Sequence, residues 1–162
     1  MHHLHIFIDG SVNTPFNVGY GACLVVSDLG TSIESLKDMV TVKRFEQTSS
    51  TKLELQILLW VLSEIITITD GDNLQLTVYT DSQNIMGLPQ RRTHLEQSNY
   101  FSSKNRQLRN YELYQEFYRL TSALNCSFIK LKGHQASSKK NEIDKLFGLV
   151  DQASRRALRK DF

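Results

Sequence analysis

The chain has 162 residues, of which 40% are hydrophobic and 22% are charged, with a net charge of +2. This length fits a single domain covering residues 1–162, and the apolar content is enough to build a core, which excludes global disorder. No apolar run approaches the ~18 residues of a membrane-spanning helix, so a protein that spans a membrane is excluded.

The first half of the chain predicts three strands, a helix and a fourth strand. Strands are expected over residues 5–9, 19–26 and 40–45, and the short gap between the first two predicts an antiparallel hairpin. Leucine and isoleucine at helical spacing predict an amphipathic helix over 52–67. The β-rich run over 74–80 follows that helix, so it is expected to pair in parallel.

The second half predicts mainly helices. A short helix is expected over 82–88, closed by Gly87 and Pro89, followed by a polar, basic stretch over 89–109. Further periodicity predicts a helix over 111–124, a strand over 127–131 and a final helix over 139–160. The expected fold is therefore α/β, with a five-stranded mixed sheet whose first three strands are antiparallel, flanked by helices.

Acidic residues stand at the ends of these elements. Asp9 ends the first strand, Asp81 ends the fourth, and Glu54 lies in the first turn of the long helix. Asp144 and Asp151 lie on the final helix. Carboxylates that converge repel one another unless cations bind between them, and oxygen ligands without a His or Cys set suit Mg²⁺ or Mn²⁺.

Each of these acidic residues also has a local explanation. Asp9 can form a turn with Gly10. Glu54 can close a capping box that begins at Thr51, and Asp81 can cap the helix that follows it. Asp151 can pair with Arg155 four residues later. Metal binding is favoured only if the carboxylates lie together.

The ordered set of motifs resembles type 1 ribonuclease H over nearly the whole chain. The stretches that carry the resemblance are Ile8-Asp9-Gly10-Ser11, Gly19-Tyr20-Gly21-Ala22, Lys52-Leu53-Glu54-Leu55, Tyr79-Thr80-Asp81-Ser82, Lys132-Gly133-His134 and Val150-Asp151. The resemblance implies a ribonuclease H-like fold and a metal-dependent endonuclease that hydrolyses the RNA strand of RNA–DNA hybrids. Asp9, Glu54, Asp81 and an aspartate of the final helix are then expected to hold two Mg²⁺ or Mn²⁺ ions, with products ending in 5′-phosphate and 3′-hydroxyl.

The fourth metal ligand is either Asp144 or Asp151. The family places this aspartate about ten residues after a loop histidine, which favours Asp144 after His134. The small residues Ser154 and Ala157 that follow Asp151 fit the family pattern better, so we select Asp151. Because the two lie about 10 Å apart along a helix, only one can reach the metal site.

His134 matches the family's loop histidine, which assists proton transfer or product release. An ordinary histidine pKa near 6.5 suits that role. The loop that follows, Gln135-Ala136-Ser137-Ser138, departs from the glycine-containing family pattern, and an incidental exposed histidine is the alternative.

Residues 91–109, called the basic arm below, combine cations with Tyr100 and Phe101 and are expected to bind the hybrid. The cations expected to contact substrate are Arg91, Arg92, Lys104 and Arg106. Ser50 and Thr51 stand where the family often has asparagines, and Asn13 lies in the loop after Asp9, so these three are further expected contacts. A solvated loop is the alternative for the arm.

The charges divide unevenly along the chain. Residues 1–83 carry four basic and ten acidic side chains (−6), while residues 84–162 carry fifteen and seven (+8). Such a division fits a cation-holding site beside a polyanion-binding surface, although a chance imbalance explains it equally. A cytoplasmic location is expected, because two cysteines form no disulfide framework and the first residues lack a secretory signal. The protein is also expected to be a monomer. Another nuclease of the same fold, or a non-catalytic nucleic-acid-binding module, remains the alternative function.

Overall fold

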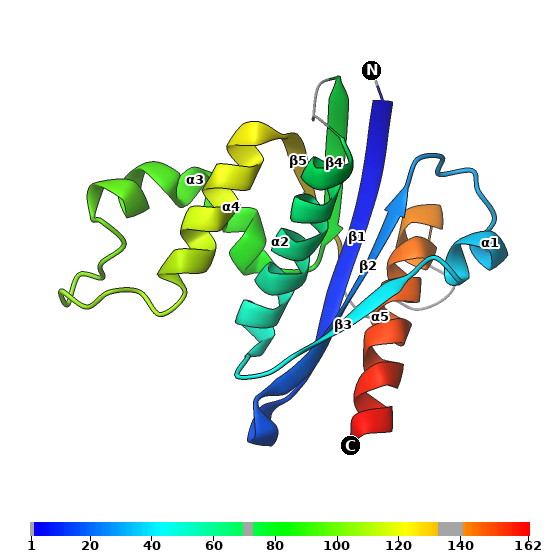
Figure 1. The fold of residues 1–162 in the computed structure, drawn as a ribbon, viewed down its shortest axis with the longest axis horizontal. Helices are drawn as coiled ribbons and strands as arrows, with labels where there is room; N and C mark the ends of the chain where they lie inside the picture. The colour runs from blue at the N-terminus through cyan, green and yellow to red at the C-terminus, as the bar shows by residue number, and fades with distance from the viewer. Residues whose placement is uncertain (1, 70–72, 133–140) are drawn as a thin grey trace.

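The computed structural model describes residues 2–69, 73–132 and 141–162 and contains a five-stranded sheet with the order β3-β2-β1-β4-β5 (Figure 1). The strands are β1 (His2–Asn13), β2 (Val18–Val26), β3 (Thr41–Phe45), β4 (Leu74–Thr80) and β5 (Asn125–Lys130). The predicted mixed sheet is confirmed: β1, β2 and β3 pair antiparallel, while β4 pairs parallel to both β1 and β5.

Helices cover both faces of the sheet. Helix α2 (Ser50–Ile68) packs on one face against β1 and β2 and is backed by α4 (Tyr111–Ala123). Helix α5 (Glu142–Asp161) packs on the other face against the same two strands. Side chains alternate along β1, so Ile6 and Ile8 face α2 whereas Phe7 faces α5. The central strand is thus buried on both sides.

Two short helices lie in stretches for which the sequence predicts no element. The 3₁₀ helix η1 (Thr14–Phe16) forms the tip of the β1–β2 hairpin, with Pro15 within it and Asn13 capping it. Helix α1 (Ile33–Lys37) follows β2 and is capped by Ser32. Each is one turn long, too short to show helical periodicity in the sequence.

The predicted end of the helix after β4 is wrong. Helix α3 runs from Gln83 to Gln97, with Pro89 inside it, instead of ending at residue 88. Pro89 removes one helical hydrogen bond, but burial of Leu88 and Leu95 favours continuation. The Tyr118 hydroxyl of α4 also donates to the Leu88 carbonyl at 2.6 Å. Tertiary packing therefore outweighs the local preference to stop.

Among the described residues, no helix has both the length and the hydropathy needed to cross a membrane.

Candidate active site

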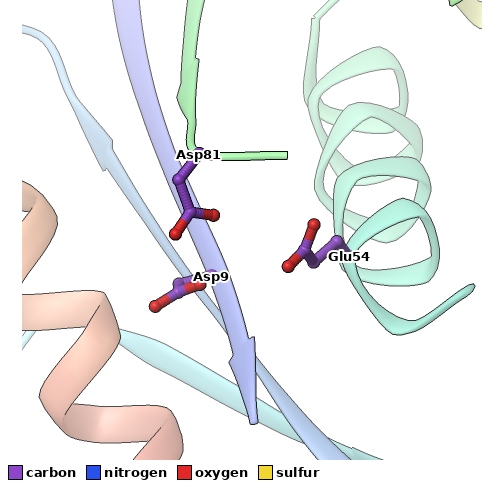
Figure 2. A group of neighbouring side chains, drawn as sticks. All are labelled: Asp9, Glu54 and Asp81. Carbon is purple, nitrogen blue, oxygen red and sulfur yellow. The ribbon is translucent and has the colours of Figure 1, made fainter. Parts of the chain in front are cut away.

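Three elements bring Asp9, Glu54 and Asp81 together. Asp9 lies within β1 opposite Ala22, Asp81 follows the last residue of β4, and Glu54 lies in the second turn of α2. Each offers a carboxylate oxygen, and these oxygens all lie within 4.8 Å of one another (Figure 2). The convergence that a metal site requires is therefore present, and we call Asp9, Glu54, Asp81 and Asp151 the acidic centre.

Glycines let α2 approach the sheet closely enough to place Glu54. A Cβ atom added to Gly21 of β2 would lie 2.7 Å from the Ile57 Cβ. One added to Gly10, next to Asp9, would lie 2.8 Å from the Leu53 Cδ2. Neither distance is compatible with ordinary packing. A side chain at Gly21 would push α2 and its glutamate away from β1, whereas one at Gly10 would first displace the Leu53 side chain.

The carboxyl groups of this centre interact unfavourably. Asp9 is only 6% exposed, and burial, a hydrogen bond with the Asp151 carboxyl and the negative charge of Asp81 raise its pKa to about 9. Burial also raises the pKa of Glu54 to about 7, although a hydrogen bond from the Ser82 hydroxyl opposes the rise. Like charges crowded in a low-dielectric site favour protonation unless a cation replaces the proton.

Helix α5 places Asp151 beside Asp9. The Ser11 and Ser154 hydroxyls lie 3.1 Å apart, which joins β1 to α5 one turn after Asp151. Ser154 is fully buried and donates to the Asp151 carbonyl at 3.0 Å, so a larger side chain there would separate the helix from the strand. The Asp151 carboxylate also accepts a hydrogen bond from Arg155 at 3.0 Å, as one local explanation predicts.

Asp144 is used differently. Its carboxylate accepts a hydrogen bond from the Asn141 amide at 3.2 Å, while the Asn141 side chain accepts one from the Asp144 amide at 2.9 Å. This capping box fixes the start of α5. The structure thus gives Asp144 a helix-capping contact and gives Asp151 the contact with Asp9.

Three of the local explanations are wrong. Asp9 and Gly10 form no turn, because β1 continues to Asn13 and pairs them with Ala22 and Gly21 of β2. Ser49, not Thr51, caps α2 and accepts a hydrogen bond from the Lys52 amide at 3.2 Å, so Glu54 lies beyond the capping position. Ser82, not Asp81, caps α3 and accepts from the Ile85 amide at 3.2 Å. Helix capping therefore explains neither the glutamate nor the aspartate. Ser82 itself is a site residue that sequence reasoning missed, although it stands in the motif with Asp81.

The donor set fits a hard divalent cation. All the groups that converge are carboxylates, and oxygen-only sites are typical of Mg²⁺ and Mn²⁺. The raised pKa of Asp9 shows how costly its ionised form is without a positive charge nearby. Asp9, Glu54 and Asp81 are the residues that would hold such an ion.

The basic arm differs from the predicted loop at its start. Arg91 and Arg92 lie on α3 and not in a loop, because the helix continues past Pro89. The Arg92 guanidinium donates to Glu96 at 2.6 Å and to the Ser122 hydroxyl at 2.8 Å, and the Arg91 guanidinium lies 5.8 Å from the centre of the Tyr114 ring. Lys104 and Arg106 do lie in the exposed connection between α3 and α4.

The remaining predicted contacts are spread over the structure. Ser50 and Thr51 are exposed in the first turn of α2, one turn before Glu54. Asn13 ends β1, and its side chain accepts a hydrogen bond from the Phe16 amide at 3.4 Å. His134 lies outside the described residues.

Comparisons with known proteins agree with this arrangement. A model of the RNase H family matches residues 1–154. Comparison with curated proteins finds no matching sequence. The PFV RNase H domain in its solution structure is 12% identical, with a TM-score of 0.74 over 96% of this chain and 94% of that one.

Two further solved structures have the same fold. LC9-RNase H1, described as a type 1 RNase H with the type 2 active-site motif, is 15% identical, with a TM-score of 0.71 over 97% of this chain and 72% of that one. LC11-RNase H1, isolated from compost by a metagenomic approach, is 15% identical, with a TM-score of 0.64 over 98% of this chain and 99% of that one.

The match over residues 1–154 establishes that the chain belongs to the RNase H family. It is by class a ribonuclease H, as the ordered motifs predict. Members of this family depend on divalent metal ions and act on RNA–DNA hybrids.

Proposed function

We propose that residues 1–162 form a single ribonuclease H domain that cuts the RNA strand of an RNA–DNA hybrid internally, leaving 5′-phosphate and 3′-hydroxyl ends. The observation that carries this proposal is the convergence of Asp9, Glu54 and Asp81 within 4.8 Å at the end of β4. Such a cluster suits phosphodiester hydrolysis, which needs charge neutralisation and alignment more than a side-chain nucleophile.

In this proposal Asp9, Glu54, Asp81 and Asp151 hold two Mg²⁺ or Mn²⁺ ions. When bound, the ions activate a water and neutralise charge on the phosphate and on the leaving 3′-oxygen. The hydrogen bond of Asp151 with Asp9 supports its inclusion, and the capping contact of Asp144 argues against the other aspartate. Ser82 orients the Glu54 carboxylate by donating to it.

Substrate contacts are proposed on two sides of the acidic centre. Ser50 and Thr51, exposed one turn before Glu54, are proposed to donate to or accept from a 2′-hydroxyl, the group that distinguishes RNA from DNA. Lys104 and Arg106 are proposed to contact backbone phosphates. Arg91 and Arg92 contribute positive charge from α3, and Asn13 contributes a polar contact from the hairpin.

The proposal includes several further expectations. His134 assists proton transfer or product release. The protein acts as a monomer in the cytoplasm, and its physiological ion is Mg²⁺ or Mn²⁺.

The test is cleavage of a labelled RNA–DNA hybrid with Mg²⁺ or Mn²⁺, beside chelator, RNA duplex, DNA duplex and single strands. Only the hybrid should be cut, only with metal, and Asp81→Asn or Asp9→Asn should lower the rate by about 10²-fold to 10³-fold or more. Asp38→Asn, an exposed aspartate that caps the end of α1, is the matched control and should retain full activity. Cleavage of DNA duplex alone would favour another nuclease of this fold. Salt-sensitive hybrid binding without cleavage would favour a non-catalytic module.

A further inference from the structure

Two exposed aromatic rings pair at the end of the molecule that holds the β1–β2 hairpin. Phe16 of η1 is 66% exposed and Phe162, directly after α5, is 52% exposed. Their ring centres lie 5.2 Å apart with the planes at 27°, so the rings stack on each other. Figure 1 shows the hairpin and the end of α5 at the same end of the structure. One face of each ring is covered by the other ring, and the remaining surface of both rings is exposed to solvent.

An open hollow of about 600 Å³ adjoins this aromatic pair. Its walls come from the hairpin and from the last turns of α5, and combine apolar, polar and basic side chains. The residues that the argument uses are Asn13, Thr14, Leu158, Arg159 and Phe162. A hollow of mixed chemistry with aromatic rings at its rim suits a ligand that has flat apolar parts joined by charged ones.

The last two turns of α5, which supply Arg159 to the hollow, carry a net positive charge. Residues 155–162 contain four basic side chains and one acidic one. The acidic one, Asp161, is paired with Arg44 at 2.8 Å, and Arg155 is paired with Asp151 at 3.0 Å. Arg159 forms no ion pair with any residue of the described ranges, so its guanidinium is available to an external anion. A polyanion is therefore the complementary ligand.

The hollow and the acidic centre lie along the same two elements, β1 and α5. Asp9, Ser11 and Asn13 share one face of β1, because strand side chains alternate with period two. Asp151, Leu158 and Phe162 share one stripe of α5, since seven and eleven residues are close to whole helical turns. From Asp151 to the end of the helix the distance is about 16 Å. At about 3.4 Å per nucleotide step, this corresponds to about four or five steps along a strand.

We propose that this hollow binds an unpaired stretch of nucleic acid that continues from the hybrid, beginning about four or five steps from the cut. The free face of Phe162, whose other face is held by Phe16, stacks on an unpaired base, and Arg159 contacts a phosphate of the same strand. Bases inside a duplex are already stacked on their neighbours. The aromatic rings are therefore expected to bind a hybrid with a single-stranded extension more tightly than a blunt hybrid. This inference rests on the proposed function, because it takes the hybrid at the acidic centre as its starting point.

The test measures affinity for hybrids with one fixed cutting position, blunt or with a six-nucleotide single-stranded extension on either side, in an Asp81→Asn background that prevents cleavage. An extension on one side should tighten binding by about 5-fold to 100-fold, the range that one stacked base provides. Phe16→Ala and Phe162→Ala should remove this gain while leaving affinity for the blunt hybrid unchanged. Arg159→Gln should lower the salt slope for the extended hybrid alone by about 0.7.

Matched controls separate the hollow from general surface effects. Ile68→Ala removes a side chain that is 79% exposed at the far end of α2, and Lys37→Gln removes a cation on α1; both should retain the gain. If Asp81→Asn protein with Phe16, Phe162 and Arg159 unchanged bound blunt and extended hybrids with equal affinity, the inference would be overturned while the proposed function stayed intact. An equal loss for both hybrids in Phe162→Ala would also overturn it. Absence of blunt-hybrid binding, together with absence of cleavage by the unmodified protein, would instead count against the proposed function.

Discussion

The acidic centre and the basic arm differ in whether their charged side chains have partners of opposite charge within the protein. In the acidic centre the buried Asp9 carboxyl has three further carboxyl groups as neighbours, and its pKa rises to about 9. In the arm, Arg92 is neutralised by Glu96 and rests 5.3 Å from the centre of the Tyr118 ring. The first arrangement is unfavourable until something outside the protein binds, whereas the second is satisfied within the fold. Strong dependence on a ligand is therefore expected of the centre and not of Arg92.

The largest effect that would sharpen this contrast concerns the two aspartates of α5. Asp151→Asn should lower the cleavage rate by about 10²-fold or more, because it removes a carboxylate beside Asp9. Asp144→Asn should change the rate by less than about 3-fold and should lower stability by about 1 kcal/mol through the weakened cap. Single-turnover rates and thermal melts of both variants provide the measurement. The opposite order of rates would assign the fourth ligand to Asp144.

Gly21→Ala should displace Glu54 from the acidic centre by shifting α2, the helix that carries it. The added methyl would meet the Ile57 Cβ at 2.7 Å, so α2 must shift and carry Glu54 with it. We expect a loss of about 1–3 kcal/mol in the free energy of unfolding and a clear fall in kcat. Gly148→Ala on α5 is the control, because nothing lies within 4 Å of its added Cβ and alanine favours a helix. Equal stability of the two variants in chemical denaturation would contradict this packing.

The metal-free protein should lose stability as the pH rises. The folded-state pKa values of Asp9 and Glu54 lie above their ordinary values of 3.8 and 4.5, so the folded protein binds more protons than the unfolded one between about pH 4 and pH 9. Ionisation across that window therefore destabilises the fold. Asp9→Asn should raise the Tm in chelator at pH 8 by about 4–8 °C, equivalent to about 2 kcal/mol.

The same melts contain their own control. Mg²⁺ or Mn²⁺ should raise the Tm of the unsubstituted protein at pH 8, and should raise it less in Asp9→Asn. At pH 4 the Asp9 carboxyl of the folded unsubstituted protein is protonated and therefore neutral, like the asparagine of the variant, so the difference in Tm should nearly vanish. A metal-free Tm that rises between pH 5 and pH 8 would contradict the predicted sign.

The smallest effects are expected in the basic arm. Arg106→Gln or Lys104→Gln should each lower the salt slope of hybrid binding by about 0.7–0.9, with little change in kcat. Arg92→Gln should change the slope less, because Glu96 already neutralises part of its charge. Binding isotherms at several salt concentrations measure these slopes. A larger change for Arg92 than for Arg106 would show that the arm binds through α3.

Sequence reasoning was most successful where one periodic pattern decided the element. The predicted strand over 74–80 is reproduced by β4 with the same bounds, and its parallel pairing with β1 is confirmed. Helix α2 extends the predicted helix by only a few residues. The order of strands and helices along the chain is enough to predict that Asp9 and Asp81 lie near each other, at the carboxyl end of β4.

The errors arose where distant contacts decide local structure. Pro89 is a helix breaker in isolation, but the buried contacts of Leu88 and Leu95 carry α3 beyond it, and the sequence alone does not show those partners. The predicted N-cap of α2 is wrong for a different reason. Ser49 and Thr51 are both good capping residues, and only the backbone geometry before α2 selects the first.

The parallel pairing of β1 with β4 has a consequence for the order in which the protein becomes active during synthesis. The two strands are separated by residues 14–73, and α5, which packs against β1, comes later in the chain than both. Pairing across so long a segment is slow compared with helix formation. The four-residue acidic centre is therefore complete only after Asp151 of α5 has been synthesised and has packed beside Asp9.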